Sequence, residues 1–441
     1  MTKYSVLIPA KDGMPYLQFA VNSVLRQGYS DFELLVSLEG SESESEAVKF
    51  VAGISDSRLR LLRPVPGLSM TEHWDWLQKA ATGEWQIYVG QDDGLQEGFF
   101  EIADKLVSIA EASKTRVIAS TRAYLHWPGS FFDKDGKGSI TRGAKNIVQI
   151  RSLQKDTLSA LIGWKTYFEL PQMYTTSLFH SSLIADCRQA QDGDFLTCHP
   201  QDANLAALAN AHEKTYVLSG IPLGWVGSSK KSAGLAVSSQ TPSDQDFRGK
   251  ERKLAESYLE SVRDSRHSYP AWAGDFSIGN LRIYLWQALI RTKKIQAPGF
   301  IRAIEANWFL TLLLARCTIE IPNGRRNSYL SGLRQIGERN EVSLSPLYFF
   351  GVAAFSVAAF IHRGKGFLGS IPRRLRLPTS SAFGTSWSRT AAGEPWQELF
   401  IRGAVPMPSI KDLELGKKWK PIFSQEKTVN ADYPNHIRND S

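Results

Sequence analysis

Cysteine is scarce in this chain, with three residues in 441, and histidine and methionine are also rare, at eight and five. Cys187, Cys198 and Cys317 lie far apart and show no spacing typical of zinc ligands. Disulfide-dense scaffolds belong to oxidising compartments, and three separated cysteines provide no such framework. The composition therefore excludes a small secreted disulfide scaffold and favours a reducing compartment.

An apolar leader is also missing. The sequence begins MTKYSVLIPAKDG and enters a predicted strand almost at once, which leaves no room for the apolar core of a signal peptide. We therefore expect the N-terminal part of the chain in the cytoplasm.

No apolar run is long enough to cross a membrane comfortably. The longest stretch without a charged residue is 343–361, SLSPLYFFGVAAFSVAAFI, which serines and a proline interrupt. A membrane span needs about 20 apolar residues. Two interpretations stay open for this stretch: a helix that lies in the membrane interface, or a buried helix of a second domain. The cations that follow it suit an interfacial helix better than a membrane span: His362, Arg363, Lys365, Arg373, Arg374 and Arg376.

Acidic residues are absent from 342–393. From residue 301 to the end of the sequence, 19 lysines and arginines stand against 11 aspartates and glutamates, so this third carries the whole formal excess of +8. Such a segment predicts contact with an anionic membrane surface, and hence a peripheral position on the inner face of the cytoplasmic membrane. Nucleic acid is the less favoured partner, because no recognisable reader motif accompanies the charge.

What the sequence does contain is an alternation of strand and helix patterns. Hydrophobic residues make up 42% of the chain and aromatic residues 11%, enough for well-filled cores in two to four domains. Strand, helix, strand so early in the chain favours parallel pairing through right-handed crossovers. Strands are predicted at 4–9, 32–38 and 59–62, and helices at 14–27, 46–54 and 69–81, the last with Thr71 as its N-cap. Further along the chain, the same patterns predict a strand at 173–179 and helices at 99–112, 181–190 and 300–319.

Two adjacent carboxylates end the next strand, in the stretch GEWQIYVGQDDG. Residues 85–89 form a short apolar strand, so Asp92 and Asp93 fall at its C-terminal end, where open α/β sheets bind their ligands. An ordinary turn is the alternative, because Asp and Gly are common turn formers. Two like charges at this place favour a divalent cation carried on a diphosphate, since Mg²⁺ accepts few protein oxygens and keeps phosphate and water as its other ligands.

Downstream, Asp202 follows a proline at the start of a helix whose apolar face includes Leu205, Leu208 and Ala209. Proline before an acidic first turn is typical of a helix start, so Asp202 has a structural interpretation as a capping residue.

The stretches YSVLIPAKDGMPYLQFAVNSVLRQGYSDFELLVSLEGSES and HWDWLQKAATGEWQIYVGQDDGL resemble the A-fold glycosyltransferases of family 2, which transfer sugars from nucleotide-sugars. The resemblance covers roughly residues 3–235. It implies a Rossmann-like mixed sheet flanked by helices, here followed by a mainly α-helical C-terminal region. It also implies an inverting transfer from a nucleoside-diphosphate sugar (UDP, GDP or dTDP) to a hydroxyl of a glycan or lipid-linked acceptor, as in the synthesis of bacterial surface polysaccharide.

The resemblance assigns roles to particular positions. Pro9, Ala10, Lys11 and Glu39 would border the base and the ribose, while Asp92 and Asp93 would hold the diphosphate and a Mn or Mg ion. Asp202 would be the general base that takes the proton of the acceptor hydroxyl. The segment 221–234, IPLGWVGSSKKSAG, would fold over the donor.

This chain departs from the family pattern at two places. Gln91 stands where the family usually carries a further Asp, and Leu38-Glu39 stands where an Asp is common. Two other functions therefore stay open: a sugar nucleotidyltransferase, although the loop at 10–15 has a single glycine, and a catalytically silent scaffold with the same fold.

The predicted domain organisation has four parts. Residues 1–236 form the nucleotide-sugar-binding domain, and 237–265 form a polar linker and a first helix. Residues 266–377 form a helical, membrane-associated domain, and 378–441 form a basic tail.

Overall fold

The computed structural model describes residues 2–11, 13–39, 45–130, 139–142, 147–165, 167–197, 200–229, 232, 281–292, 298–319, 330, 333, 334, 337, 338, 342, 346–364, 388–391 and 414–415. The predicted linker at 237–265 lies outside these residues, as does most of the tail at 378–441. The predicted domain boundaries therefore stay predictions.

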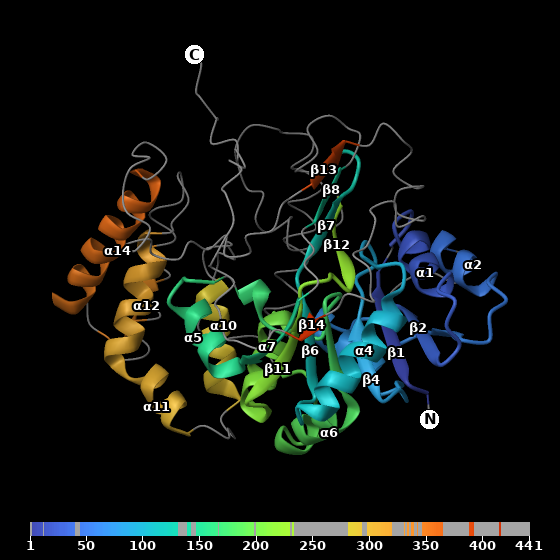
Figure 1. The fold of residues 1–441 in the computed structure, drawn as a ribbon, viewed down its shortest axis with the longest axis horizontal. Coiled ribbons are helices and arrows are strands. Elements are labelled where there is room, and N and C mark those ends of the chain that lie inside the picture. Colours follow the sequence, from blue (N-terminus) through green and yellow to red (C-terminus); the bar gives the residue numbers. More distant parts are fainter. Residues whose placement is uncertain are drawn as a thin grey trace, which may run out of the picture.

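A mixed sheet of nine strands forms the centre of the described part of the chain (Figure 1). Its order is β14-β9-β11-β6-β10-β4-β1-β2-β3, and β4, β1, β2 and β3 run parallel. The antiparallel β10 separates β4 from β6. The strands are β1 (Tyr4–Ala10), β2 (Phe32–Leu38), β3 (Leu59–Leu62), β4 (Trp85–Tyr88), β6 (Val117–Ser120), β9 (Ile147–Ser152), β10 (Ser177–His180), β11 (Thr215–Ser219) and β14 (Glu414–Leu415).

Helices cover both faces of this sheet, because its central strands are apolar on both sides. In β1, Val6 and Ile8 pack into one core and Leu7 into another, as the two-residue period of a strand requires. The first core is covered by α1 (Leu17–Leu25), α2 (Glu46–Ala52) and α4 (Phe99–Ala112). The second is covered by α3 (Met70–Gln78), α6 (Ser181–Ala190) and α7 (Gln201–His212).

A smaller sheet continues from the large one. Its order is β13-β8-β7-β12-β5, formed by β5 (Gly94–Leu95), β7 (Ala123–His126), β8 (Ser139–Arg142), β12 (Gly224–Ser228) and β13 (Ser388–Ala391). Three strands of the large sheet lead directly into it, because β4 is followed by β5, β6 by β7 and β11 by β12. The short junctions between the two sheets therefore lie side by side.

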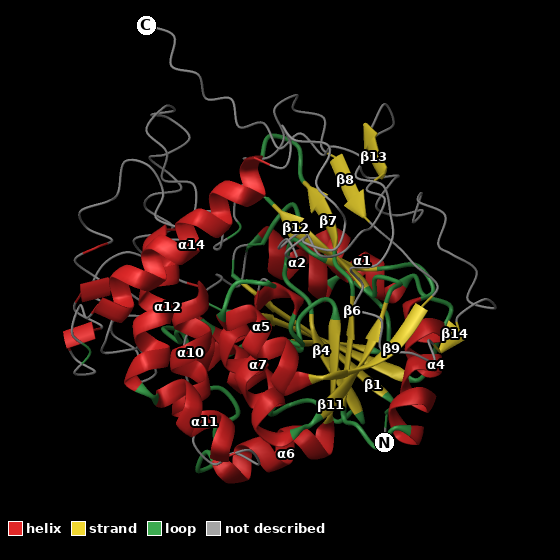
Figure 2. Cartoon of the chain, turned by 60° about the vertical axis from the view of Figure 1, so that its left-hand side comes forward, coloured by secondary structure: helices red, strands yellow, loops and turns green. Residues whose placement is uncertain are grey.

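Helices from the C-terminal half gather beside the sheets (Figure 2). They are α10 (Leu281–Arg291), α11 (Pro298–Glu305), α12 (Asn307–Ile319) and α14 (Pro346–Gly364), and they share a core with α5 (Leu153–Leu161) and α7. None of the helices in the described ranges combines the length and the apolarity that a transmembrane span needs. The predicted α/β fold with a helical C-terminal region is confirmed.

Three predicted elements need correction. Helix α3 is capped by Ser69, not by Thr71: the Ser69 hydroxyl accepts a bond from the Glu72 amide and the Glu72 carboxylate accepts one from the Ser69 amide. The strand predicted at 173–179 begins only at Ser177, because Met173 and Thr175 have positive φ angles of 50° and 44°.

The helix predicted at 300–319 is two helices that meet at Ala306. The Trp286 indole of α10 donates to the Ile304 carbonyl at 2.8 Å, and this carbonyl lies at the break. A tertiary contact thus occupies a backbone acceptor that a continuous helix would use itself.

Candidate functional site

The predicted nucleotide-binding positions lie at one edge of the large sheet. Strands β4, β1 and β2 are parallel neighbours, so their C-terminal ends meet. The Lys11 amide donates to Gln91 Oε1 at 3.0 Å, and the Glu39 amide donates to the Ala10 carbonyl at 3.0 Å. These two bonds join the loops after β1, β2 and β4 into one corner.

Asp93 is completely buried within this edge and accepts bonds through both carboxylate oxygens. The Gly227 amide donates to Oδ1 at 2.6 Å. The Gly90 amide donates to Oδ2 at 3.0 Å, and the Thr175 hydroxyl donates to the same atom at 2.5 Å. The Tyr174 side chain is a further partner of this carboxylate. Asp93 therefore anchors β12 and the segment before β10 to the end of β4.

Asp92 lies beside it with different partners. Its Oδ2 accepts a bond of 2.7 Å from the Ser229 hydroxyl and another from the Ser232 hydroxyl. Its backbone carbonyl accepts a bond of 2.8 Å from the Trp127 indole. The segment 221–234, which the sequence predicted to close over the donor, thus contacts the carboxylate pair through its serines.

Two glycines allow the backbone to approach the carboxylate pair this closely. A Cβ on Gly227 would lie 1.7 Å from the Asp92 carbonyl oxygen, and a Cβ on Gly90 would lie 2.7 Å from Asp93 Oδ2. Real Cβ atoms do not approach so closely, so only glycine allows the backbone to bind the pair in this way.

Burial raises the pKa of both carboxyl groups, and the charge of Asp93 adds to the rise at Asp92. Burial, followed by the charge of Asp93, raises the pKa of Asp92 to about 6, against the effect of the two serine hydroxyls. Burial also raises the pKa of Asp93, while its four hydrogen-bond partners oppose the rise. A cation bound here would remove the repulsion between the two carboxylates.

The donor set fits an ion that arrives with a substrate. Mg²⁺ is usually held by one or two carboxylates together with substrate phosphates. Both oxygens of Asp93 already accept protein bonds, whereas Asp92 is bound by hydroxyls of a single loop. Among the described residues, no three metal-ligating side chains cluster together, so phosphate and water would have to complete the coordination.

The exposed cation of this corner is Lys11. Its Nζ lies 3.0 Å from Glu39 Oε2, and its side chain is 71% exposed. The Gly67 amide donates to Glu39 Oε1 at 3.0 Å, so Glu39 is held in place from two sides. Pro9 and Ala10 are buried within β1, which leaves Lys11 as the member of this set that faces solvent.

Asp202 lies in the first turn of α7, where the helix N-terminus favours a carboxylate. Its Oδ2 accepts a short hydrogen bond from the Tyr167 hydroxyl, and its Oδ1 accepts one of 2.8 Å from the Ala203 amide. Burial raises the pKa of Asp202, and the bond from Tyr167 and the charge of Arg122 oppose the rise. Pro200, not Asp202, is the N-cap residue of α7.

Arg122 is a site residue that the sequence did not indicate. It lies at the junction between β6 and β7, where Nη2 donates to Gln172 Oε1 at 2.5 Å and the guanidinium packs over the Phe168 ring at 5.0 Å. Its charge acts on Asp202 and also on Tyr174, the neighbour of Asp93. Arg122 therefore links the two acidic positions electrostatically.

Other partners were also missed. Thr175 and Tyr174 carry no signal in the sequence, because a lone hydroxyl on a predicted strand resembles any other strand residue. Ser229 and Ser232 could have been found, since they belong to the serine-rich segment after β12. Of the neighbouring residues, Cys198, His199, Lys230 and Lys231 lie outside the described part of the chain.

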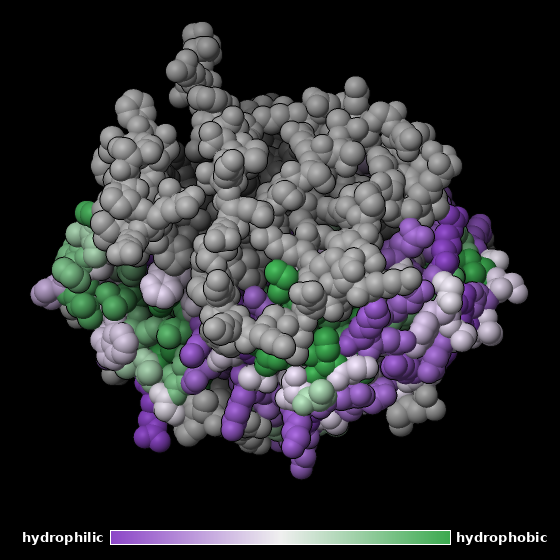
Figure 3. Space-filling model, in the orientation of Figure 1, coloured by the Kyte–Doolittle hydropathy of each residue, from purple (hydrophilic) through white to green (hydrophobic). Residues whose placement is uncertain are grey.

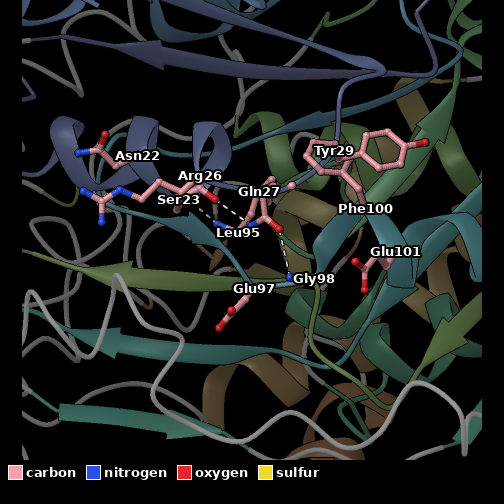
Figure 4. Close-up of a pocket in the computed structure, with 11 residues that line it drawn as sticks. Asn22, Ser23, Arg26, Gln27, Tyr29, Leu95, Glu97, Gly98, Phe100 and Glu101 are labelled. Atoms are coloured by element: carbon pink, nitrogen blue, oxygen red, sulfur yellow. Dashed lines mark hydrogen bonds between the residues drawn. The ribbon is translucent and has the colours of Figure 1, made fainter. Parts of the chain in front are cut away.

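A separate pocket of about 290 Å³ lies between the C-terminal end of α1 and the start of α4 (Figure 4). The Ser23 hydroxyl accepts a bond of 3.0 Å from the Leu95 amide, and Gln27 Oε1 accepts one of 3.1 Å from the Gly98 amide. None of the predicted site residues lines this pocket, so it is not the site formed by the carboxylates.

Comparison with known proteins finds one family match, in the N-terminal part of the chain. Residues 5–131 match the model described as glycosyl transferase family 2. A search of curated proteins found no match.

Solved structures offer only distant likenesses. The structure of S. aureus TarS 1–349 in complex with UDP-GlcNAc is 12% identical with a TM-score of 0.39, and the match covers 81% of this chain and 92% of that one. The structure of S. aureus TarS 1–349 gives 13% and 0.38 over the same shares. The structure of S. aureus TarS gives 12% and 0.38 over 78% of this chain and 55% of that one. Likenesses this distant assign no residue and no substrate.

Proposed function

We propose, from the match of residues 5–131 to the model of glycosyl transferase family 2, that this chain is an inverting, metal-dependent glycosyltransferase. The donor would be a nucleoside-diphosphate sugar, and the acceptor a hydroxyl of a glycan or of a lipid-linked glycan in the synthesis of bacterial surface polysaccharide. The observation that carries the proposal is the buried pair Asp92–Asp93 at the end of β4, tied to the serine-rich segment after β12.

Asp92 is the residue we assign to the ion, Mn²⁺ or Mg²⁺, with Asp93 as its support. The reason is that Asp93 uses both oxygens to hold backbone amides and hydroxyls, whereas the partners of Asp92 are two serine hydroxyls. When bound, the ion would supply positive charge for the departing diphosphate. If an ion replaced a serine hydroxyl at Asp92, the hydrogen bonds by which Asp93 holds β12 and the segment before β10 would stay in place.

Asp202 is the residue we assign as general base. In an inverting transfer the acceptor oxygen forms a bond to the anomeric carbon, the bond from that carbon to the diphosphate oxygen breaks, and the proton of the acceptor hydroxyl goes to a carboxylate. The Tyr167 bond and the Ala203 amide fix the orientation of Asp202, and its raised pKa makes it a better proton acceptor than an exposed aspartate.

Lys11 and Glu39 are the residues we assign to the nucleoside, with Pro9 and Ala10 forming the strand end beneath it. Lys11 can move, because it is exposed and paired with a single carboxylate. UDP, GDP and dTDP differ in uncharged groups, which the charges of Lys11 and Glu39 do not distinguish. The identity of the base is therefore left to experiment.

The test combines a donor panel with two substitutions. Purified wild-type protein is incubated with Mn²⁺ and a set of UDP-, GDP- and dTDP-sugars, and donor hydrolysis and transfer are measured. Asp202→Asn should lose at least a thousandfold in transfer while it still binds the nucleotide, and Asp92→Asn should lose metal-dependent nucleotide binding. Full turnover by Asp202→Asn would overturn the assignment of the base.

A second function has one observation in its favour. Gln91 contributes an uncharged amide to the Lys11 backbone where the family usually carries an Asp. A catalytically silent scaffold would tolerate this loss of charge. If calorimetry with Mn²⁺ detects no binding of any nucleoside diphosphate, the scaffold is the better assignment.

We place the protein at the cytoplasmic face of the membrane, where nucleotide-sugars and lipid-linked acceptors meet. This location is a proposal that follows from the composition of the C-terminal third.

A further inference from the structure

Among the described residues, helix α14 packs along one side against α12. The Tyr348 hydroxyl lies 2.8 Å from the Thr318 hydroxyl, and a Cβ on Gly351 would lie 2.9 Å from the Ala315 side chain. The Arg316 guanidinium lies over the Phe355 ring at 5.6 Å. Because later residues of α14 meet earlier residues of α12, the two helices are antiparallel and one face of α14 is buried.

The opposite face of α14 is exposed and apolar. Phe350 is 69% exposed, Phe349 61% and Val357 57%. Among residues 346–357, every exposed side chain is uncharged, and Ser356 is the polar one; the set is Pro346, Leu347, Phe349, Phe350, Ala353, Ala354, Ser356 and Val357. Hydrophobic side chains gather on this side of the molecule, over α12 and α14, while hydrophilic ones dominate the side of α1 and α2 (Figure 3). A helix on the surface of a soluble domain normally presents charged residues to water, so this face, here called the α14 face, needs a partner.

The charge of the surrounding sequence selects the partner. The helix ends with His362 and Arg363, and Lys365, Arg373, Arg374 and Arg376 follow within the acid-free stretch 342–393. An isologous contact pairs the same surface on both subunits, so it offers no opposite charge to the cations that follow α14 in the sequence. Like charges in such a contact oppose association. A surface rich in anionic lipid instead attracts the cations and accepts the aromatic side chains at the same time.

We propose that the α14 face docks on an anionic lipid bilayer, with α14 in the interface plane and Phe349 and Phe350 inserted among the acyl chains. Trp308, the second residue of α12, is 53% exposed. Its side chain is of the aromatic type enriched at membrane interfaces. The inference specifies the surface behind the proposed membrane location and does not require sugar transfer to be correct.

The experiment is co-sedimentation of the full chain with vesicles. Binding is expected to vesicles of phosphatidylglycerol and phosphatidylcholine in equal parts, at least tenfold weaker binding to pure phosphatidylcholine, and weaker binding at 0.5 M salt. The double substitution Phe349→Ser with Phe350→Ser should reduce binding to the anionic vesicles at least tenfold. Val65→Ser is the matched control, because Val65 is 68% exposed but lies between β3 and α3.

Two further measurements separate the alternatives. Sedimentation of the protein without lipid should show the same oligomeric state for wild type and the double variant, and transfer to a water-soluble acceptor should be the same for both. A self-association that the double substitution abolishes, without vesicle binding by the wild type, would show that a second copy covers the face. If the wild type is a monomer and does not bind anionic vesicles, other residues of the same chain cover the α14 face. Either result overturns the proposal and leaves the assignment of the carboxylates untouched.

Discussion

The amide of Gly227 donates a 2.6 Å hydrogen bond to Oδ1 of Asp93, across 134 positions of sequence. This bond joins the end of β4 to β12, and through β12 to the smaller sheet. A carboxylate of the candidate site therefore positions β12, the strand within the segment that the sequence predicts to fold over the donor.

We expect the substitution Gly227→Ala to separate β12 from Asp93. The new Cβ would lie 1.7 Å from the Asp92 carbonyl, so β12 must move and the bond to Asp93 must lengthen. The free energy of unfolding should fall by about 3 kcal/mol, and nucleotide affinity should fall with it. Thermal unfolding and calorimetry measure the two effects. Gly28→Ala is the control, since a Cβ at Gly28 meets no atom within 4 Å, and it should leave both quantities within error of wild type.

The raised pKa of Asp92 predicts two opposite pH trends. Because its pKa is about 6 in the folded protein and lower in the unfolded chain, the protonated carboxyl stabilises the fold. In the absence of metal, this contribution is fully present below the unfolded pKa of about 4 and is lost as the pH rises through about 6. Metal binding requires the ionised form, so Mn²⁺-dependent nucleotide affinity should fall as the pH drops through the same range.

Asp92→Asn provides the check. In chemical denaturation at pH 5 and pH 7.5, the variant should show a smaller change in the free energy of unfolding between the two pH values than the wild type does. It should also be more stable than wild type at pH 7.5, by an amount on the order of 2 kcal/mol. Equal pH dependence in both proteins would contradict the assignment.

Arg122 should set the pH range in which Asp202 acts as a base. Its charge lowers the pKa of Asp202, against the stronger effect of burial, so Arg122→Gln should raise that pKa. The acidic limb of the kcat/KM profile is expected to shift to higher pH, and kcat at pH 7 to fall about tenfold. Arg302→Gln, an exposed arginine on α11, should leave the profile unchanged. If kcat falls but the acidic limb of the kcat/KM profile does not shift, Arg122 acts through packing and not through its charge.

A buried ion cluster is centred on Asp156 of α5, the helix that packs against α7. Asp156 accepts bonds from Arg151 Nε at 2.9 Å and from the Tyr216 hydroxyl at 2.7 Å, and its Oδ1 lies 2.9 Å from Lys165 Nζ. Burial alone would raise the pKa of Asp156, but the Arg151 bond and the Lys165 charge outweigh it and hold that pKa below its usual range.

Asp156→Asn should therefore cost about 3 to 5 kcal/mol in the free energy of unfolding, because two buried cations lose their counter-charge. The wild-type cluster contributes its stability above the unfolded pKa of Asp156 and loses it as the pH falls through the lower folded value. Chemical denaturation at pH 7 checks the first expectation. Asp31→Asn is the control, since Asp31 is exposed, and a loss as small as its own would refute the role of the cluster.

Local patterns predicted much of the fold. The helices at 99–112 and 181–190 have the bounds that the sequence indicated, because apolar spacing within one helix is a local property. The cap of α3 is also a local property, since Ser69 and Glu72 have the spacing of a capping box. The break at Ala306 depends on Trp286, twenty positions earlier, and no local pattern reports it.

Of the candidate site, the sequence indicated the carboxylates. Asp92 and Asp93 were indicated by their position at a strand end, and Asp202 by the family resemblance, and their roles remain predictions. Thr175 and Gly227 lie 82 and 134 positions from Asp93, and nothing in their own surroundings indicates that they bind it. The roles of Pro9, Ala10, Lys11 and Glu39 remain predictions.

The three junctions between the large and the small sheet also bear on how this enzyme could diversify. The carboxylate pair lies at the first junction and Arg122 at the second, while Ser229 follows the strand that the third junction leads into. The far ends of β7 and β12 reach back to the pair, because Trp127 follows β7 and Ser229 follows β12, and both donate to Asp92. Exchange of the loops at these two ends should therefore change the surroundings of Asp92 as well, so selection on either loop acts on the carboxylate pair at the same time.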